Sequence, residues 1–184
     1  MNAHEVLTQR VRDGDEHAFT ELVREFHTPL CTYLARLVGN DELGSDLAQE
    51  TLIRAWTSLP TLREEQRFKA WLYRIATNLA HSHLRHARLI SWLPWTEASE
   101  RSSHSALHIA GPEEQVGEND MIRKTLARLS PQYRACLLLQ TVAGFSQRDI
   151  AQLLGISEKS VGSNVCRARD QFRHIYSSLK GDTE

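Results

Sequence analysis

The sequence has few of the residues that mark special classes of protein. Its 184 residues include three cysteines, five prolines and nine glycines. The cysteines are odd in number and widely spaced, and they form no Cys-x-x-Cys pair, so neither a disulfide framework nor a zinc module is indicated. The low proline and glycine content, with 41% hydrophobic and 24% charged residues, argues against collagen and disorder. The composition is that of a globular protein.

Long apolar runs are also missing. The longest, such as residues 136–139, fall far below the roughly 18 residues that a membrane-spanning helix needs. The first residues, MNAHEVLTQRVRDG, lack the apolar core of a signal peptide. We therefore expect a cytoplasmic protein with reduced thiols and no membrane insertion.

The formal net charge of −1 hides a strong segregation of charge along the chain. Residues 1–53 carry four basic and ten acidic side chains, residues 54–92 seven and two, residues 93–120 one and six, and residues 121–184 ten and five. Basic segments are typical of surfaces that bind polyanions, whereas acidic segments face solvent or a protein. A solvated helix surface would explain either basic segment taken alone.

Apolar residues recur at helical spacing through most of the sequence, and no segment keeps the period of two that a strand requires. The pattern predicts three helices in the first half of the chain, over about residues 18–38, 41–59 and 68–89. Four short helices are predicted beyond residue 118, and residues 93–118 have the composition of a linker. We predict an all-α protein with two small helical domains, residues 1–92 and 119–184, joined by a flexible acidic linker.

The second predicted helix has two different faces. Its apolar face consists of Leu52, Ala55, Trp56 and Leu59. On another side, Asp46, Gln49 and Ile53 share one face, with Glu50 beside them. A solvated helix side is the simplest reading of that second face, but an outward isoleucine among acids and amides favours a protein-docking surface.

The third predicted helix carries a continuous polar and basic stripe, which consists of Arg74, Asn78, His81, Arg85 and Arg88. Such a stripe suits the phosphate backbone of a nucleic acid. The aromatic residues nearby are able either to stack on unpaired bases or to pack in the core; they are Phe68, Trp71 and Tyr73.

The segment from residue 146 to residue 173 has the spacing of a helix-turn-helix. Ser146 and Asp149 form a variant of the capping box, Gly155 supplies the turn, and Ser157 caps the second helix. The second helix is predicted to present residues suited to base edges and phosphates, namely Ser160, Ser163, Asn164, Arg167 and Arg169. A plain helical hairpin is the alternative, and the combination of turn glycine, small crossing residue and basic helix favours DNA binding.

Three blocks follow one another along the chain: DLAQETLIRAW, FKAWLYRIATNLAHSHLRHARL and LSPQYRACLLLQTVAGFSQRDIAQLLGISEKSVGSNVCRARDQFR. They resemble the successive blocks of bacterial extracytoplasmic-function (group 4) RNA polymerase sigma factors of the sigma-70 family. The resemblance implies a factor that binds core RNA polymerase and directs promoter-specific transcription initiation. Such a factor recognises and melts the minus-ten element and reads the minus-thirty-five element.

The resemblance also implies roles for particular residues. The clamp helices of the largest polymerase subunit are expected to contact Asp46, Gln49, Glu50 and Ile53. Minus-ten DNA is expected to contact the loop and the third helix, through Arg63, Arg67, Lys69, Arg74, Asn78, His81, Arg85 and Arg88, with Asn78 near the captured base. Minus-thirty-five DNA is expected to contact the C-terminal helix, through Lys159, Ser160, Ser163, Asn164, Arg167 and Arg169.

Three positions depart from the family pattern. Gly162 and Asn164 stand where a lysine and an arginine are usual, so minus-thirty-five affinity is expected to be weak or altered, and Asn164 is a candidate for pairing with adenine. Ser45 replaces a common acid beside Asp46. It is interpreted either as the N-cap of a helix that begins near Asp46 or as a phosphorylation site that restores the charge.

Other functions find little support in the sequence. It contains no glycine-rich phosphate loop, nucleophile elbow or paired carboxylates with a base, so we predict neither an enzyme nor a cofactor. His81 and His83 lie two residues apart on a helix, so they point to different sides and do not predict a metal site. A DNA-binding regulator that acts without polymerase is the main alternative. The expected partners are core RNA polymerase, promoter DNA and, where one exists, an anti-sigma factor.

Overall fold

The computed structural model describes residues 3–59, 62, 68–90 and 113–181, and these residues form helices and no strand. The helices are α1 (Ala3–Arg12), α2 (Glu16–Val38), α3 (Asp41–Ser58), α4 (Phe68–Ile90), α5 (Glu113–Arg128), α6 (Pro131–Thr141), α7 (Gln147–Leu154) and α8 (Glu158–Gly181). None of the helices in these ranges has the length and apolar character that a membrane crossing requires. The predicted all-α class is confirmed.

Local capping sets the ends of α2 and α3. The Asp15 side chain accepts hydrogen bonds from the backbone amides of His17 and Ala18 at the start of α2, and Gly39 ends that helix with a φ of 79°. Asn40 caps α3 through a 2.8 Å hydrogen bond from the Leu43 amide. The predicted boundaries of these two helices are therefore confirmed to within a few residues.

The interpretation of Ser45 as an N-cap is wrong. Asn40 already caps α3, so Ser45 lies in the second turn of that helix, where its side chain is half-buried. A hydrogen bond from Ser45 to Cys31 acts against the burial that raises the pKa of the Cys31 thiol.

Helices α2 and α3 cross closely at a pair of small residues. A Cβ atom placed on Gly44 would lie 2.5 Å from the Cα of Ala35, which is shorter than any normal contact between carbon atoms. Gly44 is therefore required by packing rather than by backbone conformation, and it allows α2 to approach α3 along its length.

Helix α4 completes the N-terminal half by packing against α2 and α3. Buried within this half, Tyr33 lies 2.8 Å from the Thr77 hydroxyl, which itself donates a 2.7 Å hydrogen bond to the Tyr73 carbonyl. Because the Thr77 proton is used in this way, the Tyr33 hydroxyl is the donor to Thr77. Burial raises the pKa of Tyr33 above its ordinary value, so the hydroxyl stays protonated.

The structure corrects four expectations about the helices. Helix α1 was not predicted, and α5 begins at Glu113, inside the segment expected to be a linker up to residue 118. Helix α8 has 24 residues and is not short. The Trp56 side chain, expected in the apolar face of α3, is 39% exposed, while Leu52, Ala55 and Leu59 are buried as predicted.

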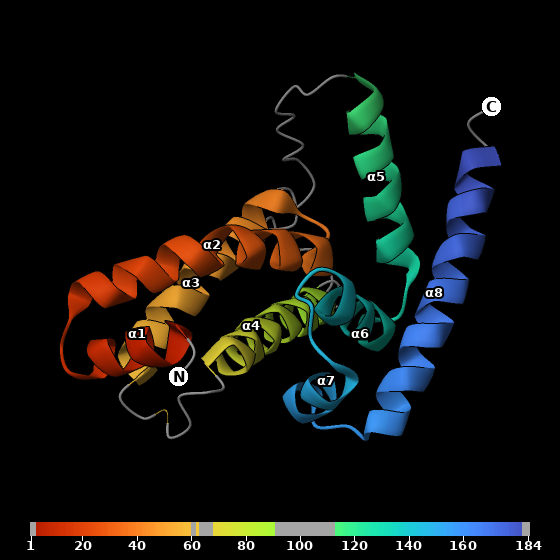
Figure 1. Cartoon of the computed structure of the whole chain (residues 1–184). Coiled ribbons are helices and arrows are strands. Elements are labelled where there is room, and N and C mark those ends of the chain that lie inside the picture. Colours follow the sequence, from red (N-terminus) through yellow and green to blue (C-terminus); the bar gives the residue numbers. More distant parts are fainter. Residues whose placement is uncertain (1–2, 60–61, 63–67, 91–112, 182–184) are drawn as a thin grey trace.

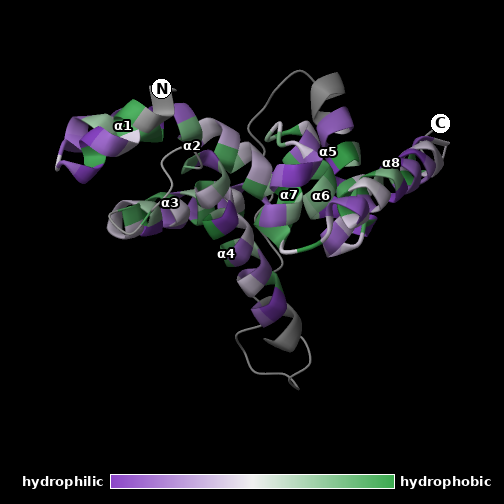
Figure 2. Cartoon of the chain, turned by 60° about the horizontal axis from the view of Figure 1, so that its bottom comes forward, coloured by the Kyte–Doolittle hydropathy of each residue, from purple (hydrophilic) through white to green (hydrophobic). Residues whose placement is uncertain are grey.

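The two halves of the chain lie in contact. Helices α1 to α4 form one group and α5 to α8 the other, with α6 and α7 beside α4 (Figure 1). Helix α1 and the C-terminal part of α8 lie at opposite ends of the molecule (Figure 2). The buried apolar residues form one cluster that runs through both halves, from Val11 to Ala168.

Candidate functional site

The outer face of α3 contains the residues expected to dock on a protein. Asp46, Gln49, Glu50 and Ile53 are all exposed, and the Ile53 side chain is 64% exposed. Glu50 forms a 2.6 Å salt bridge with Arg54 one turn later, which holds its carboxylate at the surface. Covering this side chain with another molecule would gain the free energy of removing its apolar surface from water.

The exposed apolar surface on this side of α3 extends further than the sequence indicated. Trp56 lies three residues after Ile53 and therefore on the same side of α3. Its ring packs at 4.7 Å, centroid to centroid, against Phe19 of α2. The exposed part of this tryptophan adds a large apolar surface beside Ile53. The apolar pattern alone pointed to the core, because it does not show that α2 covers only one side of the ring.

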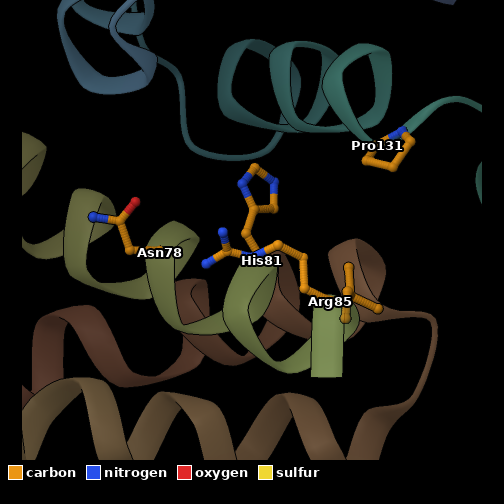
Figure 3. Close-up of a pocket in the computed structure, with 5 residues that line it drawn as sticks. Asn78, His81, Arg85 and Pro131 are labelled. Carbon is orange, nitrogen blue, oxygen red and sulfur yellow. The ribbon is translucent and has the colours of Figure 1, made fainter. Parts of the chain in front are cut away.

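The stripe on α4 is only partly open. Arg74, Asn78 and Arg85 are exposed, whereas His81 and Lys69 are half-buried. The Arg85 and Asn78 side chains flank His81 on the side of α4 that faces α6 (Figure 3). Arg88 lies in α4, but its side chain is outside the described residues, and so are Arg63 and Arg67 in the preceding loop.

Two cations of α4 contact the C-terminal half. The Lys69 ammonium donates a 2.7 Å hydrogen bond to the Ala143 carbonyl and lies 5.0 Å from the centroid of the Phe145 ring. The Arg74 guanidinium donates a 3.2 Å hydrogen bond to the Gln152 carbonyl in α7. The N-terminal basic face therefore meets one backbone oxygen just before the predicted helix-turn-helix and one inside it.

His81 lies at the centre of this contact region. Its ring points from α4 toward α6 and lines a cavity of about 420 Å³ with Asn78, Leu84, Arg85 and Pro131 (Figure 3). Its Nε2 atom is buried with no hydrogen-bond partner in the described part of the chain. Burial, with the nearby Arg85 charge, lowers the pKa of His81, so the ring is neutral near pH 7.

The aromatic residues of α4 serve mainly to pack the core. Phe68 and Tyr73 are 2% and 1% exposed, so stacking of their rings on unpaired bases is excluded in this arrangement. Phe68 packs against Phe26, and Tyr73 packs against Tyr33 and Phe145. Trp71 is half-buried and keeps an open edge.

The predicted helix-turn-helix is present as α7 and α8. Ser146 and Asp149 form a complete capping box, and Gly155 ends α7 with a φ of 67°. The Ser157 hydroxyl accepts a 3.1 Å hydrogen bond from the Ser160 amide at the start of α8. Of the apolar residues that spacing places on the inner face, Ile150, Val161 and Val165 are buried, and Leu154 and Ile156 are partly buried against the core. These capping and packing predictions are confirmed.

The outward face of α8 differs from the one expected. Lys159, Ser163 and Arg167 are exposed on one side of the helix. Arg169 is exposed as well, and both arginines donate hydrogen bonds to α6, Arg167 at 3.5 Å to the Tyr133 hydroxyl and Arg169 at 3.1 Å to the Gln140 side chain. Ser160 is half-buried.

The expected outward position of Asn164 is wrong. Its side chain is only 9% exposed, and its amide nitrogen lies 3.8 Å from the Cys136 sulfur of α6. Spacing placed Asn164 at the edge of the recognition face, but α6 packs against α8 and covers that edge. Pairing with adenine is excluded for this packing, and the residue belongs to the interior of the C-terminal half.

Comparison with known proteins identifies both halves of the chain. The family model described as Sigma-70 region 2 matches residues 22–90, and the model described as Sigma-70, region 4 matches residues 119–172. The ECF RNA polymerase sigma-E factor of Salmonella typhimurium strain LT2 is 30% identical over 173 residues, which cover 90% of this chain and 90% of the relative.

Two solved structures have the same overall fold. CnrH in complex with the cytosolic domain of CnrY is similar with a TM-score of 0.72 at 24% identity, over 96% of this chain and 99% of that chain. The sigma factor RpoE in complex with the anti-sigma factor NepR from Bartonella quintana is similar with a TM-score of 0.71 at 24% identity, over 86% of this chain and 96% of that chain.

Proposed function

Since the chain belongs to the sigma-70 family of RNA polymerase sigma factors, in its extracytoplasmic-function group, and so directs promoter-specific transcription initiation with RNA polymerase, we propose how its surfaces divide that work. The outer face of α3 docks on core polymerase, α4 takes the minus-ten element, and α8 reads the minus-thirty-five element. Sigma factors are initiation factors rather than catalysts, so RNA synthesis belongs to the polymerase.

The observation that carries this division is the exposed face of α3. Ile53 is the most exposed large apolar side chain in the described part of the chain, and Asp46 and Gln49 lie on the same side of the helix. An apolar centre with acidic and amide neighbours suits a basic protein surface rather than DNA, because the acids would repel phosphate. Trp56 enlarges that apolar centre and belongs to the same interface.

The proposed role of α4 in minus-ten recognition rests on the positive charge and the helical spacing of its exposed polar side chains. Arg74, Asn78 and Arg85 are exposed along one side of this helix, and the arginines suit contacts with phosphates. The Asn78 amide, between these cations, is suited to hold an unpaired base through hydrogen bonds to its edge. Opening a few base pairs costs a few kcal/mol of stacking, which a held base and cationic contacts to the displaced strand offset.

The role of α8 rests on its exposed face. Lys159, Ser163 and Arg167 present one hydroxyl and two cations to a major groove. This face has fewer base-reading groups than the sequence suggested, because Asn164 is buried and Arg167 and Arg169 are both hydrogen-bonded to α6. Because α4 and α8 are held on the same polymerase, binding of one promoter element raises the effective concentration of the other helix at its own element.

We assign polymerase docking and minus-ten recognition to residues 1–92 and minus-thirty-five recognition to residues 119–184, acting in the cytoplasm where transcription takes place. The similarity in fold to a sigma factor bound by NepR supports an anti-sigma factor as a further partner of this chain. Such a partner would regulate the chain by covering the surfaces that polymerase or DNA requires.

The docking proposal is tested by combining Asp46→Arg with Gln49→Ala. The double variant should lose association with core polymerase at least tenfold, about 1.4 kcal/mol, because the new cation meets a basic surface. Its helicity should be unchanged, because both positions are exposed. Co-purification with core polymerase measures the effect.

Glu21→Arg is the matched control. Glu21 is exposed on α2 and lies two residues, or about 200° around the helix, from the Phe19 that contacts Trp56. This charge reversal should leave polymerase association unchanged. Recovery of the double variant with core polymerase at the wild-type yield would overturn the assignment of α3.

A further inference from the structure

The cavity beside His81 adjoins a second cavity on the same side of α4. The first, of about 420 Å³, extends toward Leu84 and Arg85, and the second, of about 320 Å³, extends along α6 and the end of α7. Asn78, His81 and Pro131 line both cavities, so the two lie next to each other. Cavities of about 300–1,000 Å³ commonly hold small-molecule ligands. The size of each cavity therefore suits a small ligand of about one ring.

Polar side chains of α4 converge on these cavities. Asn78, His81 and Arg85 follow one another at intervals of three and four residues and therefore share one side of the helix, and the His81 ring points toward α6 (Figure 3). The His81 Nε2 atom is buried and has no hydrogen-bond partner among the described residues. Buried polar atoms normally have such a partner. A group inside the cavity is in a position to supply the missing hydrogen bond.

The charge of the lining selects the sign of the ligand. Among the described residues that line the two cavities, Arg85 alone carries a full charge near pH 7, because burial lowers the pKa of His81 and leaves its ring neutral. One cation suits a monoanion, and a carboxylate pairs with a guanidinium through two parallel hydrogen bonds. The neutral His81 ring can carry its proton on Nε2 and donate it to the same carboxylate.

The remaining lining is largely apolar and suits an apolar body on the ligand. Leu84 and Pro131 line the first cavity, and the aliphatic side chains that line the second are Ala135, Leu153, Leu154 and Ile156. Removal of apolar ligand surface from water against these side chains favours binding. The lining as a whole therefore fits a compact apolar molecule with one acidic group.

We propose that the free chain binds a small monocarboxylate at this place, with the carboxylate on Arg85 and His81 and an apolar body of about one ring between Leu84 and Pro131. The Asn78 amide, which lines both cavities, is available to a polar substituent of the ligand. This site is additional to the polymerase and promoter surfaces proposed above. It belongs to the free chain, so its occupancy can be measured without polymerase or DNA.

The first test uses 4-fluorobenzoate as the probe and follows its fluorine NMR signal during titration with the full-length chain. A probe of about ten non-hydrogen atoms that fits the cavity should bind with a dissociation constant of about 0.1–1 mM. Its uncharged analogue 4-fluorobenzamide should bind about tenfold more weakly, because it lacks the charge that pairs with Arg85. Inorganic phosphate at about ten times the probe concentration should not displace the probe, because a phosphate dianion needs more donors than one cation supplies.

The second test locates the probe with variants. Arg85→Gln should weaken binding of 4-fluorobenzoate at least about tenfold and leave binding of 4-fluorobenzamide nearly unchanged. Leu84→Trp fills the first cavity and should weaken binding of both compounds. Arg24→Gln is the matched control, because Arg24 is exposed on α2 and lines neither cavity, and its replacement removes the same charge. This control should bind 4-fluorobenzoate like the wild type.

Three results would overturn the proposal. Absence of saturable binding up to about 10 mM 4-fluorobenzoate would show that water alone fills the cavities. Wild-type affinity in Arg85→Gln would place the probe elsewhere, and an equal loss in Arg24→Gln would reduce the effect to general charge attraction. Circular dichroism shows whether Leu84→Trp folds; if it does not, Arg85→Gln, which changes an exposed side chain, decides alone. None of these results bears on the proposed function, which is tested with core polymerase.

Discussion

Burial separates the polar residues of α8 into those that stabilise the fold and those proposed to contact DNA. Asn164 contacts Cys136 in the interior, whereas Ser163 and Arg167 face solvent. Both kinds look alike in the sequence, since helical spacing alone does not tell where α6 will pack. The role of each residue therefore follows from its neighbours and not from its chemical type.

Asn164→Ala is predicted to lower stability by about 1 kcal/mol, because it leaves a small gap and removes the amide partner of Cys136. Promoter sequence preference should stay the same. Ser163→Ala, the neighbouring control, should change stability by less than about 0.5 kcal/mol, because its side chain is exposed. Thermal melts and holoenzyme binding to a minus-thirty-five duplex measure both effects; altered base preference in Asn164→Ala would contradict the burial.

His81 is predicted to make the folded chain sensitive to acid. Its folded pKa lies below the ordinary value of 6.5, with burial as the main cause and the Arg85 charge as the second. Well above pH 6.5 the ring is neutral in both the folded and the unfolded state, so it does not change the free energy of unfolding. As the pH falls below it, the unfolded chain takes up a proton more readily than the folded chain, so stability is lost.

Thermal melts between about pH 7.5 and about pH 5.5 should therefore show a larger loss of stability for wild type than for His81→Gln, which keeps a polar side chain but does not titrate. Other titrating groups contribute equally to both proteins, so the difference reports on His81. Identical losses for the two proteins would show that the ring protonates freely in the folded state.

At the scale of elements, two glycines inside helices have opposite effects on packing. A Cβ on Gly44 would collide with the backbone of Ala35 in α2, whereas a Cβ on Gly162 would lie 3.2 Å from the end of the flexible Gln147 side chain. Backbone atoms of a packed helix cannot move aside without disturbing their neighbours, but a side-chain amide can rotate away.

Substitution of glycine by alanine should therefore change the free energy of unfolding in opposite directions at the two positions. Gly44→Ala is expected to destabilise the chain by about 1–3 kcal/mol through overpacking, despite the better helix propensity of alanine. Gly162→Ala is expected to stabilise it by up to about 1 kcal/mol. Chemical denaturation of the two variants measures the difference, and a stabilised Gly44→Ala variant would contradict the close crossing of α2 and α3.

The sequence predicted those helices whose ends carry strong local signals. The Gly39-Asn40 pair, the Ser146 capping box and the Gly155 turn each fix a boundary through backbone hydrogen bonds or a positive φ. Helix α1 escaped prediction because it has few apolar residues, and one of them, Val6, is exposed. The first turn of α5 is acidic and contains no apolar repeat, so its composition resembled a linker.

At the scale of the whole molecule, nothing in the sequence indicated how the two halves meet. The Lys69 to Ala143 and Arg74 to Gln152 hydrogen bonds end on backbone carbonyls, which every residue has, so no side-chain pattern announces them. The motifs that led to the proposed polymerase and DNA surfaces could nevertheless be recognised in the sequence, because they depend on spacing within single helices. Contacts between halves depend on the path of the whole chain.

The proposed division of work leads to one expectation for the complete system of core polymerase, this chain and promoter DNA. Binding to the duplex requires the α3 and α8 faces, whereas opening requires α4 to hold an unpaired base beside Asn78 and the displaced strand beside Arg85. Loss of these two side chains should therefore affect opening more than binding.

The most direct test is the permanganate reactivity of thymines in promoter fragments that the holoenzyme selects from genomic DNA. Wild-type chain with core polymerase should make minus-ten thymines reactive, and neither component alone should do so. Asn78→Ala combined with Arg85→Ala should abolish this reactivity while closed-complex binding falls much less. Equal losses of opening and binding, or reactive thymines without core polymerase, would contradict the account.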